Sequence, residues 1–212
     1  MKKEKGFIRV YTRKVDKVSY PEGLAYSIHM AISWDVGHGE GIPAKEFQPL
    51  NKNYGILFAR AQIRQDDTIC PKGVEKPKIF ALEEGGYGIA ARRIEESGER
   101  DESAEGMLLL WKTKDFISFD DVGLAAINEI YTRASDHLEI DGEILARAEE
   151  YWNPVFNTEI LVPECAELHS AEELDNIKAT AVYSDGSSVS KRIVWEMDGV
   201  DFSVPGVYEV SG

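Results

Sequence analysis

Hydrophobic and polar residues alternate along much of this chain with the period of two that is typical of β-strands. In the stretch GFIRVYT (6–12), β-branched and aromatic side chains would point by turns to the two faces of a strand. Similar patterns predict further strands at 24–34, 46–51, 54–63, 78–82, 87–94, 107–113 and 116–124. The last four follow one another closely, which predicts an antiparallel meander the size of one β-propeller blade. We therefore expect an all-β fold.

One arrangement occurs twice. AISWD (31–35) is followed by FQPL (47–50), and LWKTKD (110–115) is followed by FDDV (119–122). In both copies an apolar strand ends in a hydroxyl residue, one further residue and an aspartate. The hydroxyl and carboxylate can accept hydrogen bonds from the free N–H groups of a turn. We expect each copy to be a strand, a capped turn and a short returning strand.

Residues 125–156 allow two interpretations. The stretches AAINEIY and HLEIDGEILAR can be strands of a further sheet, with Asp141-Gly142 as a hairpin turn. Alternatively, ILARAEEYW (144–152) forms a short helix.

The composition changes near Asn153-Pro154, after which short strands recur at regular spacing. Residues 177–197 predict a hairpin with a Ser-Asp-Gly-Ser-Ser turn, and 201–212 predict a closing strand after a Pro-Gly turn. This spacing is typical of a small β-sandwich. We therefore predict two domains, 1–156 and 157–212.

The chain has a net charge of −14, from 38 acidic and 24 basic side chains. Such a surface repels nucleic-acid phosphates and anionic lipid, so neither is an expected partner, whereas a neutral polyol such as a sugar is not penalised. Cys70 and Cys165 lack metal-type spacing and are predicted to be free thiols. The four histidines lie far apart, so we expect no metal site and no cofactor.

The basic N-terminus MKKEKGFIRVY lacks the apolar stretch of a signal peptide, and no apolar run is long enough to span a membrane. This predicts a cytoplasmic protein, with secretion as the alternative where a signal has been trimmed away.

The C-terminal part resembles a bacterial Ig-like domain of the group attached to glycoside hydrolases and cell-surface enzymes. The resemblance is carried by AVYSDGS (181–187), VWE (194–196) and the ending SVPGVYEVSG (203–212). It implies a small Ig-like β-sandwich.

The first part resembles the five-bladed β-propeller of glycoside hydrolase family 43, which includes arabinosidases and β-xylosidases. The motifs that carry this resemblance are AISWDVG (31–37), EFQPLN (46–51), GVEKPKIF (73–80), EGGYGIAA (84–91) and LLLWKTKDFISF (108–119). The resemblance implies a partial propeller of meander sheets that acts on polysaccharide containing arabinose or xylose.

Members of that family are inverting glycosidases, whose general acid and general base stand about 6.5–9.5 Å apart. The candidate axial positions in this chain are Glu75 and Lys76. The family's aspartate before the proline is here Lys76, which cannot act as a base, and Glu75 is expected to point elsewhere because side chains alternate along a strand. The sequence therefore assigns no catalytic residue, and whether the chain is an enzyme stays open.

Five blades need about 40–50 residues each, so residues 1–156 hold two blades and part of a third. We expect an accessory or N-terminal part of a family 43-like glycosidase, not catalytic alone, completed by a downstream catalytic domain past Gly212 or by another chain. One alternative is a non-enzymatic carbohydrate-binding or assembly module. The other is a glycosidase whose site another chain completes.

Candidate sugar-contacting residues are Trp34, His38 and Trp152. For each of them a simpler role, in an ordinary loop or among the core aromatics of a helix, is favoured. Acidic residues near strand ends, Asp115, Asp120 and Asp121, are expected to cap turns or to be solvated, and the loop 95–106 to be a solvated loop.

Overall fold

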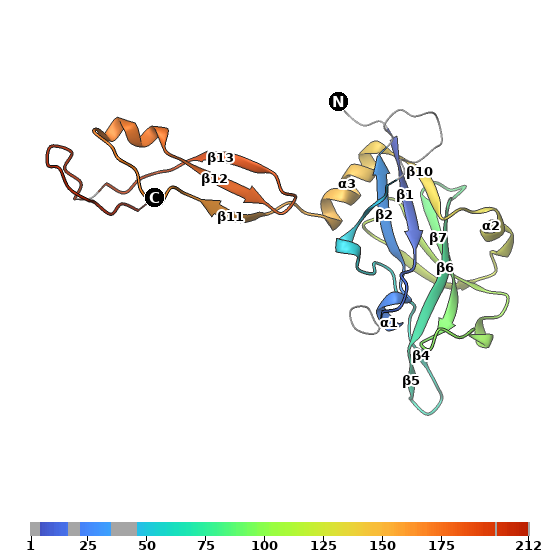
Figure 1. Ribbon diagram of the computed structural model, residues 1–212. Helices are drawn as coiled ribbons and strands as arrows, with labels where there is room; N and C mark the ends of the chain where they lie inside the picture. The colour runs from blue at the N-terminus through green and yellow to red at the C-terminus, as the bar shows by residue number, and fades with distance from the viewer. Residues whose placement is uncertain (1–4, 17–21, 35–45, 198, 212) are drawn as a thin grey trace. The chain divides into compact units, whose positions relative to one another are not determined.

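The structure is a computed structural model that describes residues 5–16, 22–34, 46–197 and 199–211 (Figure 1). Its chain divides into two compact units, Met1–Pro154 and Val155–Gly212. Antiparallel sheets make up most of the regular structure of both units, which confirms the predicted all-β class.

The first sheet of the N-terminal unit has the strand order β10-β1-β2-β3, with every pair antiparallel. Its strands are β1 (Lys5–Tyr11), β2 (His29–Trp34), β3 (Gln48–Pro49) and β10 (His137–Asp141). The strand predicted at 24–34 is shorter than expected, because Glu22–Ala25 form a helical turn, α1, before it.

The second sheet is the predicted four-stranded meander, which is confirmed by the order β6-β7-β8-β9. Its strands are β6 (Lys72–Ala81), β7 (Tyr87–Glu95), β8 (Leu108–Thr113) and β9 (Asp120–Ala125). The first of them begins earlier than predicted and passes through Pro77. A bulge between Glu75 and Lys78 accommodates the proline, which has no N–H for the ladder, and Lys76 adopts a φ of 51° there.

The two sheets bury a common hydrophobic core. The first contributes residues such as Ile8 and Met30, and the second contributes Ile89 and Trp111. On the opposite face of the second sheet, a smaller apolar cluster packs beneath Tyr131 of α2 (Asn128–Arg133). This outer face is covered by α2 over only part of its length, which leaves room for the cavity described below.

Residues 125–156 follow neither interpretation throughout. The predicted strand AAINEIY is wrong, because Asn128–Arg133 form α2, whereas His137–Asp141 form a strand as expected. The Asp-Gly hairpin is wrong, because Asp141 is the N-cap of α3 (Gly142–Trp152). The Asp141 carboxylate accepts hydrogen bonds from the N–H groups of Glu143, at 2.8 Å, and Ile144, at 3.4 Å. The alternative of a helix over 144–152 is confirmed.

The stretch 54–63, predicted to be a strand, is mostly irregular. Only its last two residues form β4 (Gln62–Ile63), which pairs with β5 (Ile69–Cys70) in a hairpin that extends from the body of the unit (Figure 1). Upstream, the segment makes a single bridge between Leu57 and Ile28. Short 3-10 turns, η1 (Asn51–Asn53) and η2 (Glu102–Ala104), complete this unit.

The C-terminal unit contains a three-stranded antiparallel sheet in the order β11-β12-β13. Its elements are β11 (Asn157–Leu161), η3 (Ala171–Asn176), β12 (Lys178–Tyr183) and β13 (Ser188–Arg192). The predicted hairpin is confirmed in β12 and β13. The predicted closing strand is wrong, because residues 201–211 make only an isolated bridge between Glu196 and Ser211.

Candidate functional site

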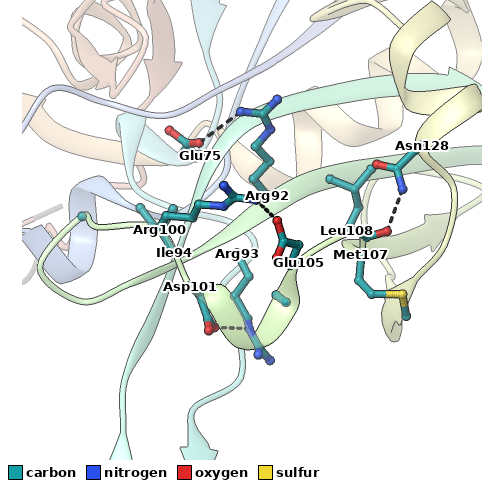
Figure 2. Close-up of a pocket in the computed structure, with 13 residues that line it drawn as sticks. Glu75, Arg92, Arg93, Ile94, Arg100, Asp101, Glu105, Met107, Leu108 and Asn128 are labelled. Atoms are coloured by element: carbon teal, nitrogen blue, oxygen red, sulfur yellow. Dashed lines mark hydrogen bonds and ion pairs between the residues drawn. The ribbon is translucent and has the colours of Figure 1, made fainter.

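A cavity of about 540 Å³ lies on the outer face of the second sheet of the N-terminal unit. Its walls come from β6, β7, the loop between β7 and β8, and the start of α2 (Figure 2). Its volume falls within the range of about 300–1,000 Å³ that is usual for small-molecule sites. The lining residues are Glu75, Arg92, Arg93, Ile94, Gly98, Arg100, Asp101, Ala104, Glu105, Gly106, Met107, Leu108 and Asn128.

Strand register gathers the charged side chains at the mouth of this cavity. Glu75 on β6 lies directly opposite Arg92 on β7. A tight turn after Glu95 then brings Arg100 opposite Ile94. Residues opposite one another in an antiparallel pair, and residues two apart on a strand, point to the same face. Glu75, Arg92 and Arg100 therefore share one face of the sheet.

A cluster of buried charges anchors the loop between β7 and β8 to the sheet. The Asp101 carboxylate accepts hydrogen bonds from Arg93 Nε at 2.6 Å and from the Ser103 hydroxyl at 2.6 Å. Lys72 Nζ lies 3.2 Å from the same carboxylate and 2.5 Å from Glu95. The side chains of Asp101 and Lys72 are only 2% and 4% exposed. This cluster fixes one wall of the cavity.

The ionisation of Asp101 follows from these contacts. Burial by itself would raise the pKa of its carboxyl, but hydrogen bonds from Ser103, Lys72 and Arg93 outweigh burial and hold the pKa at about 2. The group is therefore a structural anion and not a proton donor near neutral pH. The prediction that 95–106 is a solvated loop is wrong for Asp101 and for Ala104, which are both buried.

The charged side chains at the mouth of the cavity are held less tightly than the buried cluster around Asp101. Arg100 donates to Glu105 at 2.7 Å, and both side chains are 72% exposed. The Arg92 guanidinium stands 3.7 Å from the Glu75 carboxylate, which is too far for a hydrogen bond. Asn128 donates its side-chain N–H to the carbonyl of Gly106 at 2.6 Å (Figure 2).

A second hollow of about 410 Å³ lies at the ends of β8 and β9 and contains Asp115 and Asp120. Asp115 caps the turn after β8 by accepting hydrogen bonds from the N–H groups of Ile117 and Ser118, each at 2.9 Å. Burial tends to raise the pKa of the Asp115 carboxyl, but these two N–H groups and Thr113 lower it. The predicted capping role is confirmed.

Of the two candidate axial residues, Glu75 lines the cavity and Lys76 does not. Glu75 is part of the cavity wall and carries an ion pair with Arg92. Lys76 is at the bulge, with a side chain that is 63% exposed and that does not line the cavity. Its carbonyl accepts a hydrogen bond of 2.6 Å from the Tyr131 hydroxyl, which fixes the bulge.

The candidate sugar-contacting residues Trp34 and Trp152 do not line the cavity that contains Glu75. Trp34 Nε1 donates to Glu149 on α3 at 3.1 Å, and Trp152 Nε1 donates to the carbonyl of Phe116 at 2.7 Å. Both indole rings pack against the common core. His38 lies outside the described residues.

Sequence reasoning did not find the arginines of the cavity. Arg92 and Arg93 interrupt an otherwise apolar strand. Strand alternation would place one of them on a covered face, and a charged residue at such a position can indicate a site. The position of Arg100 depends on the turn after Glu95 and could not be read from alternation.

The metal-ligating residues, helices and cysteines of the described chain do not indicate a function. Among the described residues, no group of three metal-ligating side chains is gathered in one place, and no helix is both long enough and apolar enough to span a bilayer. Cys70 and Cys165 are free thiols, as predicted. Comparisons of this chain with protein families, with characterised proteins and with solved structures find no match.

Proposed function

We propose that this chain is an accessory part of a glycoside hydrolase family 43-like enzyme, which binds arabinose- or xylose-containing polysaccharide without cleaving it. The observation that carries the proposal is the polar cavity on the outer face of the second sheet, because its lining contains both hydrogen-bond donors and acceptors.

A sugar hydroxyl both donates and accepts hydrogen bonds, so a site for it needs groups of both kinds. Arg92 and Arg100 supply N–H donors, and Glu75 and Glu105 supply carboxylate oxygens as acceptors. Met107 adds an apolar contact of the kind that the C–H face of a sugar ring can cover. The family resemblance of the sequence adds the expected sugars, arabinose and xylose.

Binding is favoured over catalysis by the state of the carboxyl groups. An inverting glycosidase needs a general acid whose pKa is raised so that it keeps its proton. In the cavity wall, hydrogen bonds from Ser103, Lys72 and Arg93 lower the pKa of the Asp101 carboxyl, so this group does not keep a proton near neutral pH. Next to the cavity, Lys76 provides an ammonium where the family has a carboxylate.

The proposal is tested by titrating the 212-residue chain with arabinoxylo-oligosaccharides in a calorimeter, and by incubating it with nitrophenyl arabinofuranoside and nitrophenyl xyloside. We expect saturable binding and no turnover. Glu75→Gln should weaken binding about tenfold, because an amide replaces a charged acceptor, whereas Glu83→Gln on an exposed turn should not change it.

Two results would contradict the proposal. If the chain binds none of these oligosaccharides, the proposed carbohydrate-binding function is wrong. If the unmodified chain cleaves either substrate, the non-catalytic role is wrong. Turnover that rises more steeply than the protein concentration would indicate a site completed by another copy of the chain.

A further inference from the structure

We infer that the cavity selects an acidic sugar, with the Arg92 guanidinium, assisted by Arg100, binding the carboxylate of a uronic acid residue. This inference rests on the proposed carbohydrate function and names the class of sugar that the same site takes.

The first argument is the contrast between neighbouring arginines. Arg93 is largely buried, and its donors are used by Asp101 at 2.6 Å and Ser103 at 2.9 Å. Arg92 follows the opposite pattern: within the part of the chain that the structure describes, its guanidinium makes no hydrogen bond to protein, and its nearest carboxylate stands 3.7 Å away. Five N–H donors in a planar fork therefore remain for a ligand.

The second argument is the arrangement of two guanidinium groups on one face. Arg100 lies opposite Ile94, two positions along β7 from Arg92. Such diagonal neighbours lie about 7–8 Å apart, so both long side chains can reach one group. Arg92 now faces Glu75 and Arg100 donates to Glu105, and both would turn from these carboxylates toward the ligand (Figure 2). A planar carboxylate, which accepts two parallel N–H bonds from one guanidinium, fits this arrangement better than a single hydroxyl does.

The third argument is the local charge. The chain as a whole has a net charge of −14, which disfavours an anionic ligand over most of its surface. The lining of the cavity is less acidic than the rest of the surface, because its three arginines balance its three carboxylates. One of these carboxylates, on Asp101, is buried and occupied by other partners, and the ion pair of Arg100 with Glu105 is highly exposed and easily exchanged.

The test uses the full chain and two xylo-oligosaccharides that differ only in one glucuronic acid branch, together with the methyl ester of the branched compound, which keeps the ring and removes the charge. Free acetate is titrated as the carboxylate without a sugar. We expect the acidic compound to bind about tenfold more tightly than the neutral one and its ester, and acetate not to saturate the site.

Substitutions test whether the preference for the acidic oligosaccharide comes from the cavity. Arg92→Gln should abolish the tenfold preference, because it weakens binding of the acidic oligosaccharide far more than binding of the neutral one, which loses only hydroxyl contacts with Arg92. Arg100→Gln should reduce the preference. Arg64→Gln, in the exposed turn of the β4–β5 hairpin, is the matched control and should change nothing. Circular dichroism verifies that each variant is folded.

The outcomes separate the two proposals. Equal binding of the acidic and neutral compounds overturns the uronate inference and leaves the carbohydrate function intact. Binding of neither compound overturns both. A preference that persists in Arg92→Gln also overturns the inference, because the carboxylate is then bound elsewhere.

Discussion

Replacement of Asp101 by asparagine tests how the cavity wall is held. This substitution keeps the size of the side chain and removes its charge. In the native chain Asp101 lies between Arg93 and Lys72, and neither Asp101 nor Lys72 has appreciable contact with solvent. The asparagine side chain would retain one acceptor oxygen but would leave the two cations with one counter-ion fewer.

Two estimates set the expected loss of stability. The pKa of Asp101 falls from 3.8 to about 2 on folding, which corresponds to roughly 2 kcal/mol of stabilisation at neutral pH. Breaking a buried ion pair on one side costs about 3–5 kcal/mol. Because Glu95 still pairs with Lys72 in the variant, we expect a loss of about 2–4 kcal/mol.

The pH dependence follows from the direction of the pKa change. A carboxyl whose pKa is lower in the folded than in the unfolded chain stabilises the fold above its unfolded pKa, and this contribution is lost as the pH falls through the folded pKa. The stability difference between the native chain and Asp101→Asn should therefore be constant above about pH 5 and shrink between about pH 4 and pH 2.

The assay is urea unfolding at a series of pH values, followed by tryptophan fluorescence, to which three of the four tryptophans contribute from the N-terminal unit. Asp66→Asn serves as the control, because Asp66 is an exposed turn residue outside this cluster that accepts a hydrogen bond from the Thr68 N–H. It should change stability by less than about 0.5 kcal/mol. A loss below about 0.5 kcal/mol in Asp101→Asn, or a difference that does not depend on pH, would refute this account of the cluster.

Three further predictions concern residues that shape the N-terminal unit. Thr113→Val should cost about 1–3 kcal/mol in thermal unfolding, because the buried hydroxyl accepts the Phe116 N–H at 2.9 Å, and Thr113→Ser should restore most of the loss. Tyr131→Phe removes the hydrogen bond to the Lys76 carbonyl and should cost about 1 kcal/mol, with faster amide exchange at the bulge; unchanged exchange would contradict this role. Gly88→Ala places a Cβ 2.5 Å from the phenylalanine ring opposite it on β6 and should lower stability by about 1–3 kcal/mol, so an equally stable variant would refute the packing argument.

The meander of the second sheet could be predicted because its strands are apolar stretches bounded by segments rich in polar residues and glycine. The turn after β8 was predictable for a similar reason. Its Thr113 and Asp115 make local hydrogen bonds that depend on only a few consecutive residues.

Elements that depend on distant partners could not be predicted in the same way. Asp141-Gly142 carries the signals of both a hairpin turn and a helix N-cap, and the pairing of β10 with β1 decides between them. Val204 and Val207 belong to an apolar stretch typical of a strand, but a strand forms only beside a partner, and both residues are exposed.

Of the residues that line the cavity, the sequence analysis singled out only Glu75, as a candidate axial position that was expected to point elsewhere. Arg92 and Arg100 meet it through the pairing of β6 with β7 and through the turn that follows β7. Asp101 is buried because donors from three separate positions converge on it, which no local pattern encodes.

The most direct test of the central claim is an NMR titration of the isotope-labelled 212-residue chain with an arabinoxylo-oligosaccharide. The account predicts saturable shift changes at the backbone amides around Arg92, Arg100 and Met107, and little change in β11, β12 and β13. Shift changes confined to other parts of the chain, or none at saturating sugar, would contradict the assignment of this cavity as a carbohydrate site.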